Sequence, residues 1–108
     1  MQPFTCPCCG YKVFLEEPGS YEICPVCKWE DDETQLRFVT TVGANKESLQ
    51  ERQLKTIINS QEAQRYEKDP AWKPLVETNT EIEVPIRGKE YGETYPSDYK
   101  KLYYWLNM

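Results

Sequence analysis

The strongest constraint on how this chain can fold is a pair of Cys-Pro-X-Cys motifs near its start, with fourteen residues between them. Two residues between cysteines let the backbone turn tightly enough for both sulfurs to bind one tetrahedral ion. The chain contains no histidine, and four thiolates without an open position are typical of a structural zinc site. Iron in the same four-sulfur site is the chemical alternative. The predicted ligands of one structural zinc ion are Cys6, Cys9, Cys24 and Cys27.

The fifth cysteine, Cys8, lies between two predicted ligands. It has two interpretations: a reactive or metal-sensing thiol, or a small residue that fills the turn. We favour the second, because a metal-bound neighbour is not free for redox chemistry. A register in which Cys8 replaces Cys6 or Cys9 stays open, although it fits the turn less well. Gly10 ends the first turn and tolerates positive φ, whereas Lys28 ends the second, which we expect to be less relaxed or to close differently.

The composition suits one small domain over residues 1–108. Aromatic residues make up 13% of the chain, too many for a disordered protein, and a metal would stabilise so small a fold. The start of the chain has no basic and apolar regions of a signal peptide, and no apolar run is long enough to span a membrane. We therefore expect a cytoplasmic protein without membrane contact, in a reducing compartment where thiols bind metals.

The segment between the two motifs is predicted to form a β-hairpin. Tyr11–Leu15 alternates as a strand does, residues 16–19 form a turn, and Ser20–Ile23 is the returning strand. A redox Cys-X-X-Cys would instead open a helix in a βαβ unit. The order of turn, hairpin and turn therefore predicts a zinc ribbon over residues 1–45.

Several short motifs in the first half of the chain occur in a fixed order. The motifs are Cys6–Tyr11, Pro18–Cys27, Trp29–Asp32, Gly43–Asn45 and Ser48–Leu49. Together they resemble the bacterial cysteine-rich CPCC family. The resemblance implies a zinc-ribbon-like fold in a cytoplasmic bacterial setting. In size and setting, members also resemble the small immunity proteins that protect bacteria from secreted polymorphic toxins.

A helix is predicted after the ribbon. Ser48 and Glu51 form a capping box, in which each residue accepts a hydrogen bond from the backbone of the other. Leu54, Ile57 and Ile58 follow at helical spacing and are expected to bury one stripe of a helix that runs to about residue 66.

The remaining chain is predicted to form an edge hairpin and a short aromatic helix. Residues 80–86 alternate, and Pro85 confines that strand to a sheet edge. Residues 91–95 would return, and a closing helix would begin at Ser97 with Leu102 and Leu106 on its buried stripe. The predicted fold class is therefore α+β: an N-terminal zinc ribbon packed with one or two helices and a C-terminal edge hairpin, the latter elements within residues 46–108.

Two groups of residues are candidates for binding a partner. The acidic run after the second cysteine pair is either a helix start, where carboxylates complement the dipole, or an anionic patch that attracts a basic partner. The aromatic residues near the end either cover the core or form a Tyr- and Trp-rich contact surface. The candidate residues are Trp29, Glu30, Asp31, Asp32, Glu33, Tyr91, Tyr95, Tyr99, Tyr103, Tyr104 and Trp105.

The motifs that are absent restrict the function. No phosphate loop, nucleophile elbow or zinc-protease helix occurs, which argues against an enzyme. The net charge is −5 without a cluster of Lys and Arg, which disfavours direct nucleic-acid binding. We therefore expect an immunity protein that binds a cognate toxin, as a heterodimer, and occludes it. The alternatives are a zinc-ribbon adaptor in transcription or translation and a thiol or metal sensor built on Cys8.

Overall fold

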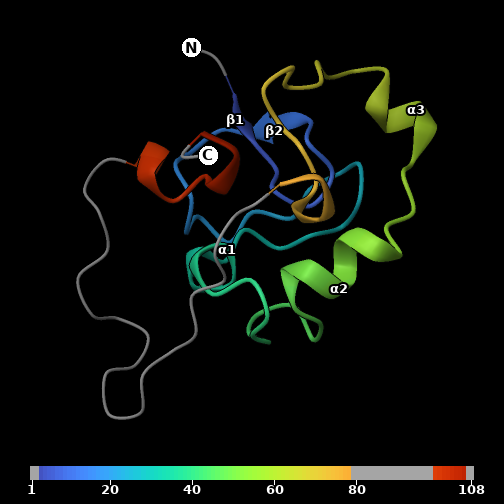
Figure 1. Cartoon of the computed structure of the whole chain (residues 1–108). Helices are drawn as coiled ribbons and strands as arrows, with labels where there is room; N and C mark the ends of the chain where they lie inside the picture. Colours follow the sequence, from blue (N-terminus) through green and yellow to red (C-terminus); the bar gives the residue numbers. More distant parts are fainter. Residues whose placement is uncertain (1–2, 79–98, 107–108) are drawn as a thin grey trace, which may run out of the picture.

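The computed structural model describes residues 3–78 and 99–106 (Figure 1). Within them, short elements are joined by long ordered loops. The strands are β1 (Phe4–Thr5) and β2 (Lys12–Phe14), the helices are α1 (Glu33–Arg37), α2 (Leu49–Leu54) and α3 (Ser60–Ala63), and the 3₁₀ turns are η1 (Leu75–Glu77), η2 (Tyr99–Lys101) and η3 (Tyr104–Leu106).

Each cysteine pair lies at the turn of its own β-hairpin. The first hairpin consists of β1 and β2, which pair antiparallel with Phe4 opposite Phe14. The second hairpin also turns at a cysteine pair, but its two flanking segments pair through single contacts and do not form continuous strands. In it, the N–H of Tyr21 donates to the carbonyl of Asp31 (3.0 Å), and Ile23 forms an isolated bridge with Glu30.

This arrangement corrects the predicted pairing between Tyr11–Leu15 and Ser20–Ile23. A strand does form inside the first of these segments, but its partner is β1. The reason is that each cysteine turn aligns the two segments that flank it, so each segment pairs across its own turn. The two predicted strands are instead linked by the Glu22 carboxylate, which accepts hydrogen bonds from the N–H groups of Leu15 (3.1 Å) and Glu16 (3.2 Å).

The predicted capping box of α2 is confirmed, but the length of the helix is wrong. Ser48 is the N-cap and bonds reciprocally with Glu51. The helix then ends at Leu54, and Asn59 caps the separate helix α3 with its own side chain. A second cap so soon after the first offers the backbone an alternative to one long helix. The expected stripe is consequently exposed: relative exposure is 70% for Leu54, 86% for Ile57 and 40% for Ile58.

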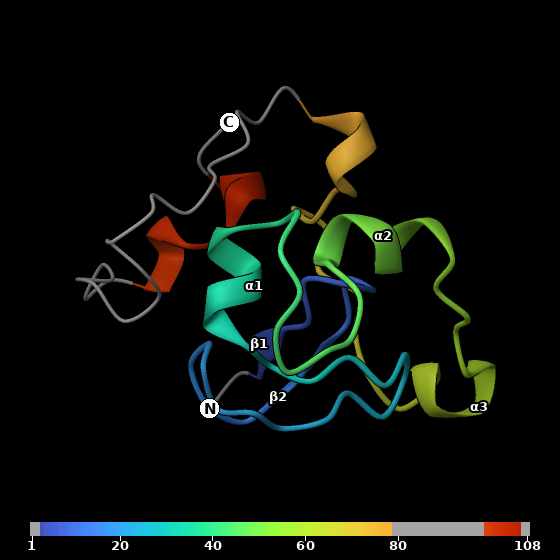
Figure 2. The ribbon, with the colours of Figure 1, turned by 90° about the horizontal axis from the view of Figure 1, so that it is seen from below.

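The end of the chain forms two 3₁₀ turns beside α1, where one helix was predicted (Figures 1 and 2). Leu102 is buried as expected, whereas Leu106 is 46% exposed. The predicted edge hairpin over residues 80–95 and the helix cap at Ser97 lie outside the described residues. The buried cluster contains the cysteines together with side chains from β2, α1, α2 and η3. The α+β class with an N-terminal cysteine ribbon is confirmed.

Candidate metal centre

The four predicted ligands come together in one buried cluster. The sulfurs of Cys6, Cys9, Cys24 and Cys27 all lie within 4.8 Å of one another. The Cys6–Cys27 and Cys9–Cys24 sulfur pairs are each 3.7 Å apart. Four sulfurs about 2.3 Å from one tetrahedral ion would be about 3.8 Å apart, so the spacing fits such an ion. This four-cysteine site could hold one metal ion, with two ligands from each hairpin.

The two metal-binding turns, which we call the first knuckle (residues 6–10) and the second knuckle (residues 24–28), have the same hydrogen bonds. In the first, the N–H of Gly10 donates to the carbonyl of Cys6 (2.8 Å), and in the second Lys28 donates to Cys24 (2.8 Å). The closing residue has positive φ in both: 85° at Gly10 and 71° at Lys28. The second knuckle therefore does not close differently, and its lysine accepts a conformation that disfavours side chains.

The first knuckle is covered by the segment after α3. The N–H of Asp69 donates to the carbonyl of Gly10 (2.8 Å), and the indole of Trp72 donates to the carbonyl of Pro7 (3.0 Å). A Cβ built on Gly10 would lie 2.6 Å from the Trp72 ring. Glycine is required here by both the positive φ and the contact with the ring.

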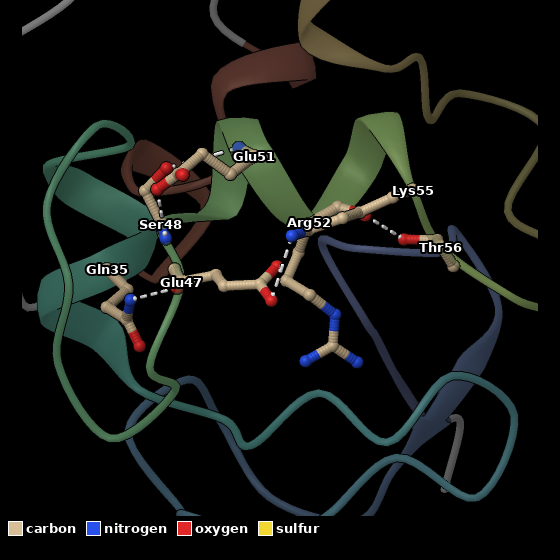
Figure 3. A network of polar contacts seen from close by, with 7 residues as sticks. All are labelled: Gln35, Glu47, Ser48, Glu51, Arg52, Lys55 and Thr56. Carbon is tan, nitrogen blue, oxygen red and sulfur yellow. Dashed lines mark hydrogen bonds and ion pairs between the residues drawn. The ribbon is translucent and has the colours of Figure 1, made fainter.

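The segment from Arg52 to Asn59, which we call the clasp (residues 52–59), joins the two knuckles. The Gln53 amide donates to the carbonyl of Pro7 (2.8 Å) in the first knuckle. In the second knuckle, the Arg52 guanidinium donates to the carbonyl of Cys27 (2.6 Å). The N–H of Asn59 donates to the carbonyl of Val26 (2.8 Å) in the same knuckle. Partners of this kind orient the ligands around a metal. Figure 3 shows Arg52 reaching from α2 with its guanidinium pointing away from the helix.

The fifth cysteine is held as a thiol beside the four-cysteine site. The Cys8 sulfur lies 3.0 Å from the Thr56 hydroxyl oxygen, and that hydroxyl donates to the carbonyl of Arg52 (Figure 3). Because the hydroxyl proton is used there, the Thr56 oxygen can accept a hydrogen bond from the Cys8 thiol. Interaction with Cys27 and burial raise the pKa of Cys8 well above its ordinary value. These contacts favour the simpler interpretation of Cys8, a turn residue that also contacts the clasp.

The cysteines of the four-cysteine site differ in the pKa of their thiols. Hydrogen bonds from Cys27, Cys6 and Cys9 lower the pKa of the Cys24 thiol far below its ordinary value. Burial raises the pKa of Cys6, which is fully buried. A buried thiolate needs a positive partner, because an isolated charge in the interior is costly. A divalent cation would satisfy all four sulfurs at once.

The acidic residues after the second knuckle are used inside the fold. Asp31 is 2% exposed and accepts a hydrogen bond from the Ser20 hydroxyl (2.6 Å). Asp32 is 5% exposed: one of its oxygens accepts from the N–H of Thr34 to cap α1, and the other from the N–H of Ala44 (2.9 Å each). Burial raises the pKa of Asp31 to about 6 although the Ser20 bonds oppose the shift.

The neighbours of these aspartates complete the same polar network. Trp29 is fully buried, and Glu33, which is half-buried, opens α1. The backbone of Glu30 is bonded in both directions by the Asn45 amide (2.9 and 2.8 Å). Buried Gln35 then accepts from Asn45 (2.9 Å). The motifs Trp29–Asp32 and Gly43–Asn45 are therefore in direct contact and hold the second hairpin against α1.

The aromatic candidates near the end are also buried where they are described. Tyr103 stacks on Trp105 with ring centroids 4.5 Å apart, and Tyr104 meets Trp105 edge to face. The Tyr104 hydroxyl donates to the carbonyl of Lys73 (2.5 Å), and burial raises its pKa. The residues Tyr91 and Tyr95 and the side chain of Tyr99 lie outside the described part. A partner-binding role for either group stays a prediction.

Sequence reasoning missed the residues that support the site. No role was predicted for Arg52, Gln53 or Thr56, yet all three contact a knuckle. Gln35 and Asn45 form the buried amide pair. The one signal in the sequence was Asn45, which falls in a motif that the resemblance singled out. Long-range side-chain bonds leave no periodic pattern, so the other residues had no signal.

This site and fold define a small protein built on two cysteine knuckles around one potential metal site. The model of the family "Cysteine-rich CPCC" matches residues 4–69, which include both knuckles and the clasp. The chain belongs to this family. A search of curated proteins found no match. Within the described residues, a search for a helix long and apolar enough to cross a membrane found none.

Proposed function

We propose that this chain is a non-enzymatic binding protein whose four-cysteine site holds one structural zinc ion. The observation that carries the proposal is the closed donor set: four buried sulfurs, two from each knuckle, at spacings that suit a tetrahedral ion. A catalytic zinc keeps a position for water, which four thiolates do not leave. The ion would join two hairpins whose strands are too short to fold alone.

Zinc is proposed over iron because the expected role is structural. Zinc has no redox chemistry. Its filled d shell imposes no coordination geometry, so it accepts a tetrahedral site of four thiolates. Elemental analysis of protein purified without chelator tests this point: we expect about one zinc per chain. One iron per chain would instead support the iron alternative. The absence of both metals would contradict the proposed metal site.

We further propose that the partner is a cognate antibacterial toxin, which this chain neutralises by occlusion. Support comes from the resemblance of the family to small immunity proteins and from the net charge of −5, which favours a partner with a basic anion-binding surface. The chemistry of the described carboxylates adds to this support. Asp31, Asp32 and Asp69 each accept structural hydrogen bonds, so they are not arranged as a free acid–base pair.

The test of this role is co-expression with the product of the neighbouring toxin gene. We expect survival of the host and a stable complex that copurifies through size exclusion. A metal-free variant, Cys24→Ser, is the control, and it should neither protect nor bind. Failure of the native chain to protect or to form a complex would contradict the immunity role. Capture of RNA polymerase or ribosomes instead would support the adaptor alternative.

A further inference from the structure

The outer side of the clasp exposes aliphatic residues that folding does not use. Leu54, next to the clasp, is 70% exposed, and Ile57 and Ile58 within it are 86% and 40% exposed. Their spacing would have suited the buried face of a longer helix, but the chain turns them to solvent while its backbone joins the knuckles. Exposed aliphatic residues gathered in one segment are typical of a contact surface.

A pocket of about 520 Å³ opens beside these residues, between the clasp and the second knuckle. Val26 and Ile57 supply aliphatic surface to it. Its wall carries three cationic side chains and one carboxylate, in a chain whose net charge is negative. The charged lining residues are Lys28, Arg52, Lys55 and Glu47.

The charges in this pocket are incompletely paired. Glu47 forms an ion pair with Lys55 (3.1 Å) through one oxygen, and its other oxygen is buried without a hydrogen-bond partner among the described residues. Arg52 donates to the carbonyl of Cys27, and no carboxylate in the described part of the chain pairs with its guanidinium. Figure 3 shows Glu47 and Arg52 reaching into the same space beneath α2. The pocket thus presents the cationic donors of Lys28 and Arg52, beside a buried carboxylate oxygen that has no partner among the described residues.

We propose that the clasp and its pocket form a docking surface for an acidic, aliphatic peptide segment of a partner protein. Carboxylates of the segment would meet Arg52 and Lys28, and its aliphatic side chains would cover Ile57 and Val26. The inference rests on the proposed function in one respect, that the chain works by binding another protein.

The same lining argues against a nucleic acid as the occupant. The Glu47 carboxylate in the lining repels a phosphate group. The described lining of the pocket contains no aromatic ring on which a base could stack. A chain of net charge −5 also repels a long polyanion. A short segment that carries both carboxylates and aliphatic side chains avoids these penalties.

Docking at this surface depends on the metal site. Arg52 and Asn59 bond to the carbonyls of Cys27 and Val26 in the second knuckle, and Val26 is itself part of the pocket wall. Removal of the metal would release the knuckle and with it one side of the pocket. Binding should therefore be lost when the metal is removed.

The test uses the full metal-loaded chain and a fluorescein-labelled probe peptide of alternating aspartate and leucine. The comparison probes are the same peptide with lysine in place of aspartate and a labelled single-stranded oligouridine. Fluorescence anisotropy gives the affinities, and backbone amide NMR shifts locate the contacts. We expect saturable binding of the aspartate peptide, with shifts confined to residues 26–28 and 47–59.

Two substitutions on the exposed surface test the contacts. Ile57→Ser and Lys28→Glu should each weaken binding of the aspartate peptide by about three- to tenfold. Their matched controls are Ile23→Ser, which changes another exposed isoleucine, and Lys73→Glu, which changes an exposed lysine outside the pocket; both should keep wild-type affinity. All four variants must retain one metal ion per chain, which shows that they are folded.

The proposal is overturned by no binding, by equal losses in the test and control variants, or by preference for the lysine peptide. Tighter binding of oligouridine than of the aspartate peptide would assign the pocket to nucleic acid instead. The proposed function is judged separately. A toxin complex that still forms with Ile57→Ser and with Lys28→Glu would contradict this docking surface but support the immunity role. Peptide binding at the clasp without protection from the toxin would support the docking surface and contradict the immunity role.

Discussion

The two knuckles have the same backbone and different surroundings. Each closes with the same hydrogen bond between its first cysteine and its last residue, and each ends at positive φ. The first is closed by Gly10 and lies beneath Trp72, so it is packed on its outer side. The second is closed by Lys28, whose side chain is exposed beside an open pocket.

The two knuckles therefore share one backbone shape, and they differ in the neighbours that surround them. The first knuckle serves as a packed anchor for the segment around Asp69 and Trp72. The second accepts backbone strain at Lys28 and keeps a charged side chain at the surface. Strain retained at one copy of a repeated element points to function more than to stability. The four-cysteine site is common to both knuckles, whereas the packing at Gly10 and the strained conformation of Lys28 each belong to one.

Removal of the metal should have the largest effect and should affect both knuckles alike. Metal sites of this kind contribute on the order of 10 kcal/mol to folding. We expect chelator, Cys9→Ser and Cys27→Ser each to abolish the folded state, as measured by circular dichroism and amide NMR dispersion. Cys8→Ser is the control and should keep both the metal and the fold. A folded chain after loss of ligands from one knuckle alone would show that the knuckles are not equivalent.

Gly10→Ala should destabilise the chain through the packing of the first knuckle. The added Cβ would have positive φ and would lie 2.6 Å from the Trp72 ring, so we expect a loss of about 3 kcal/mol in the free energy of unfolding. Gly19→Ala is the matched control. It has positive φ as well, but its Cβ would meet only the flexible Glu33 side chain, so about 1 kcal/mol is expected. Denaturant titration of both variants checks this, and equal losses would show that Trp72 contributes nothing.

A buried carboxyl in the second hairpin should make stability depend on pH. Burial raises the pKa of Asp31 from 3.8 to about 6, so the folded state binds the proton more tightly than the unfolded state. The resulting stability is fully present below pH 3.8 and is lost as pH rises through 6. From pH 7 to pH 5, the native chain should gain about 1 kcal/mol relative to Asp31→Asn.

The difference between the native chain and Asp31→Asn is the quantity to measure, because protonation of the cysteine thiolates affects both chains equally. Parallel denaturant titrations at both pH values supply it, and carbon NMR of the Asp31 carboxyl gives the pKa directly. A difference that does not change with pH would contradict the assigned burial.

Lys28→Gly should produce the smallest effect, and in the opposite direction. Glycine adopts the observed φ of 71° without a steric penalty, so we expect a gain of about 0.5–1 kcal/mol. Lys28→Ala separates the backbone from the side chain, because alanine keeps the steric penalty of a Cβ and loses the aliphatic stem together with its ammonium group. Thermal unfolding of both variants provides the measurement. A gain in Lys28→Ala that equals the gain in Lys28→Gly would mean that the side chain, and not the conformation, is unfavourable.

Local chemistry made parts of this fold predictable. The spacing of Cys6, Cys9, Cys24 and Cys27 identified the cluster, because ligand geometry limits which residues can share an ion. The capping box at Ser48 was also predicted correctly, since all its atoms lie within four consecutive residues. In both cases the information lies in short segments of the sequence.

The rest depended on contacts between distant segments. Alternation indicated a strand near Lys12 but not its partner, because β1 was two residues long and carried no pattern. The burial expected of Ile57 was wrong because the bond from Asn59 to Val26 draws the chain out of the helix. The aspartates after Trp29 were predicted either to start a helix or to form an anionic patch, and Asp32 does cap α1. Their burial was not predicted, since sequence alone does not reveal the Ser20 and Ala44 donors that allow it.

The central claim is that four cysteines, and not Cys8, hold one structural zinc ion. X-ray absorption at the zinc edge of the purified chain tests it most directly, together with the same measurement on Cys8→Ser. We expect one zinc per chain with four sulfur neighbours at about 2.3 Å in both proteins. A shell with an oxygen or nitrogen ligand in the native chain, or the loss of one sulfur in Cys8→Ser, would contradict the account.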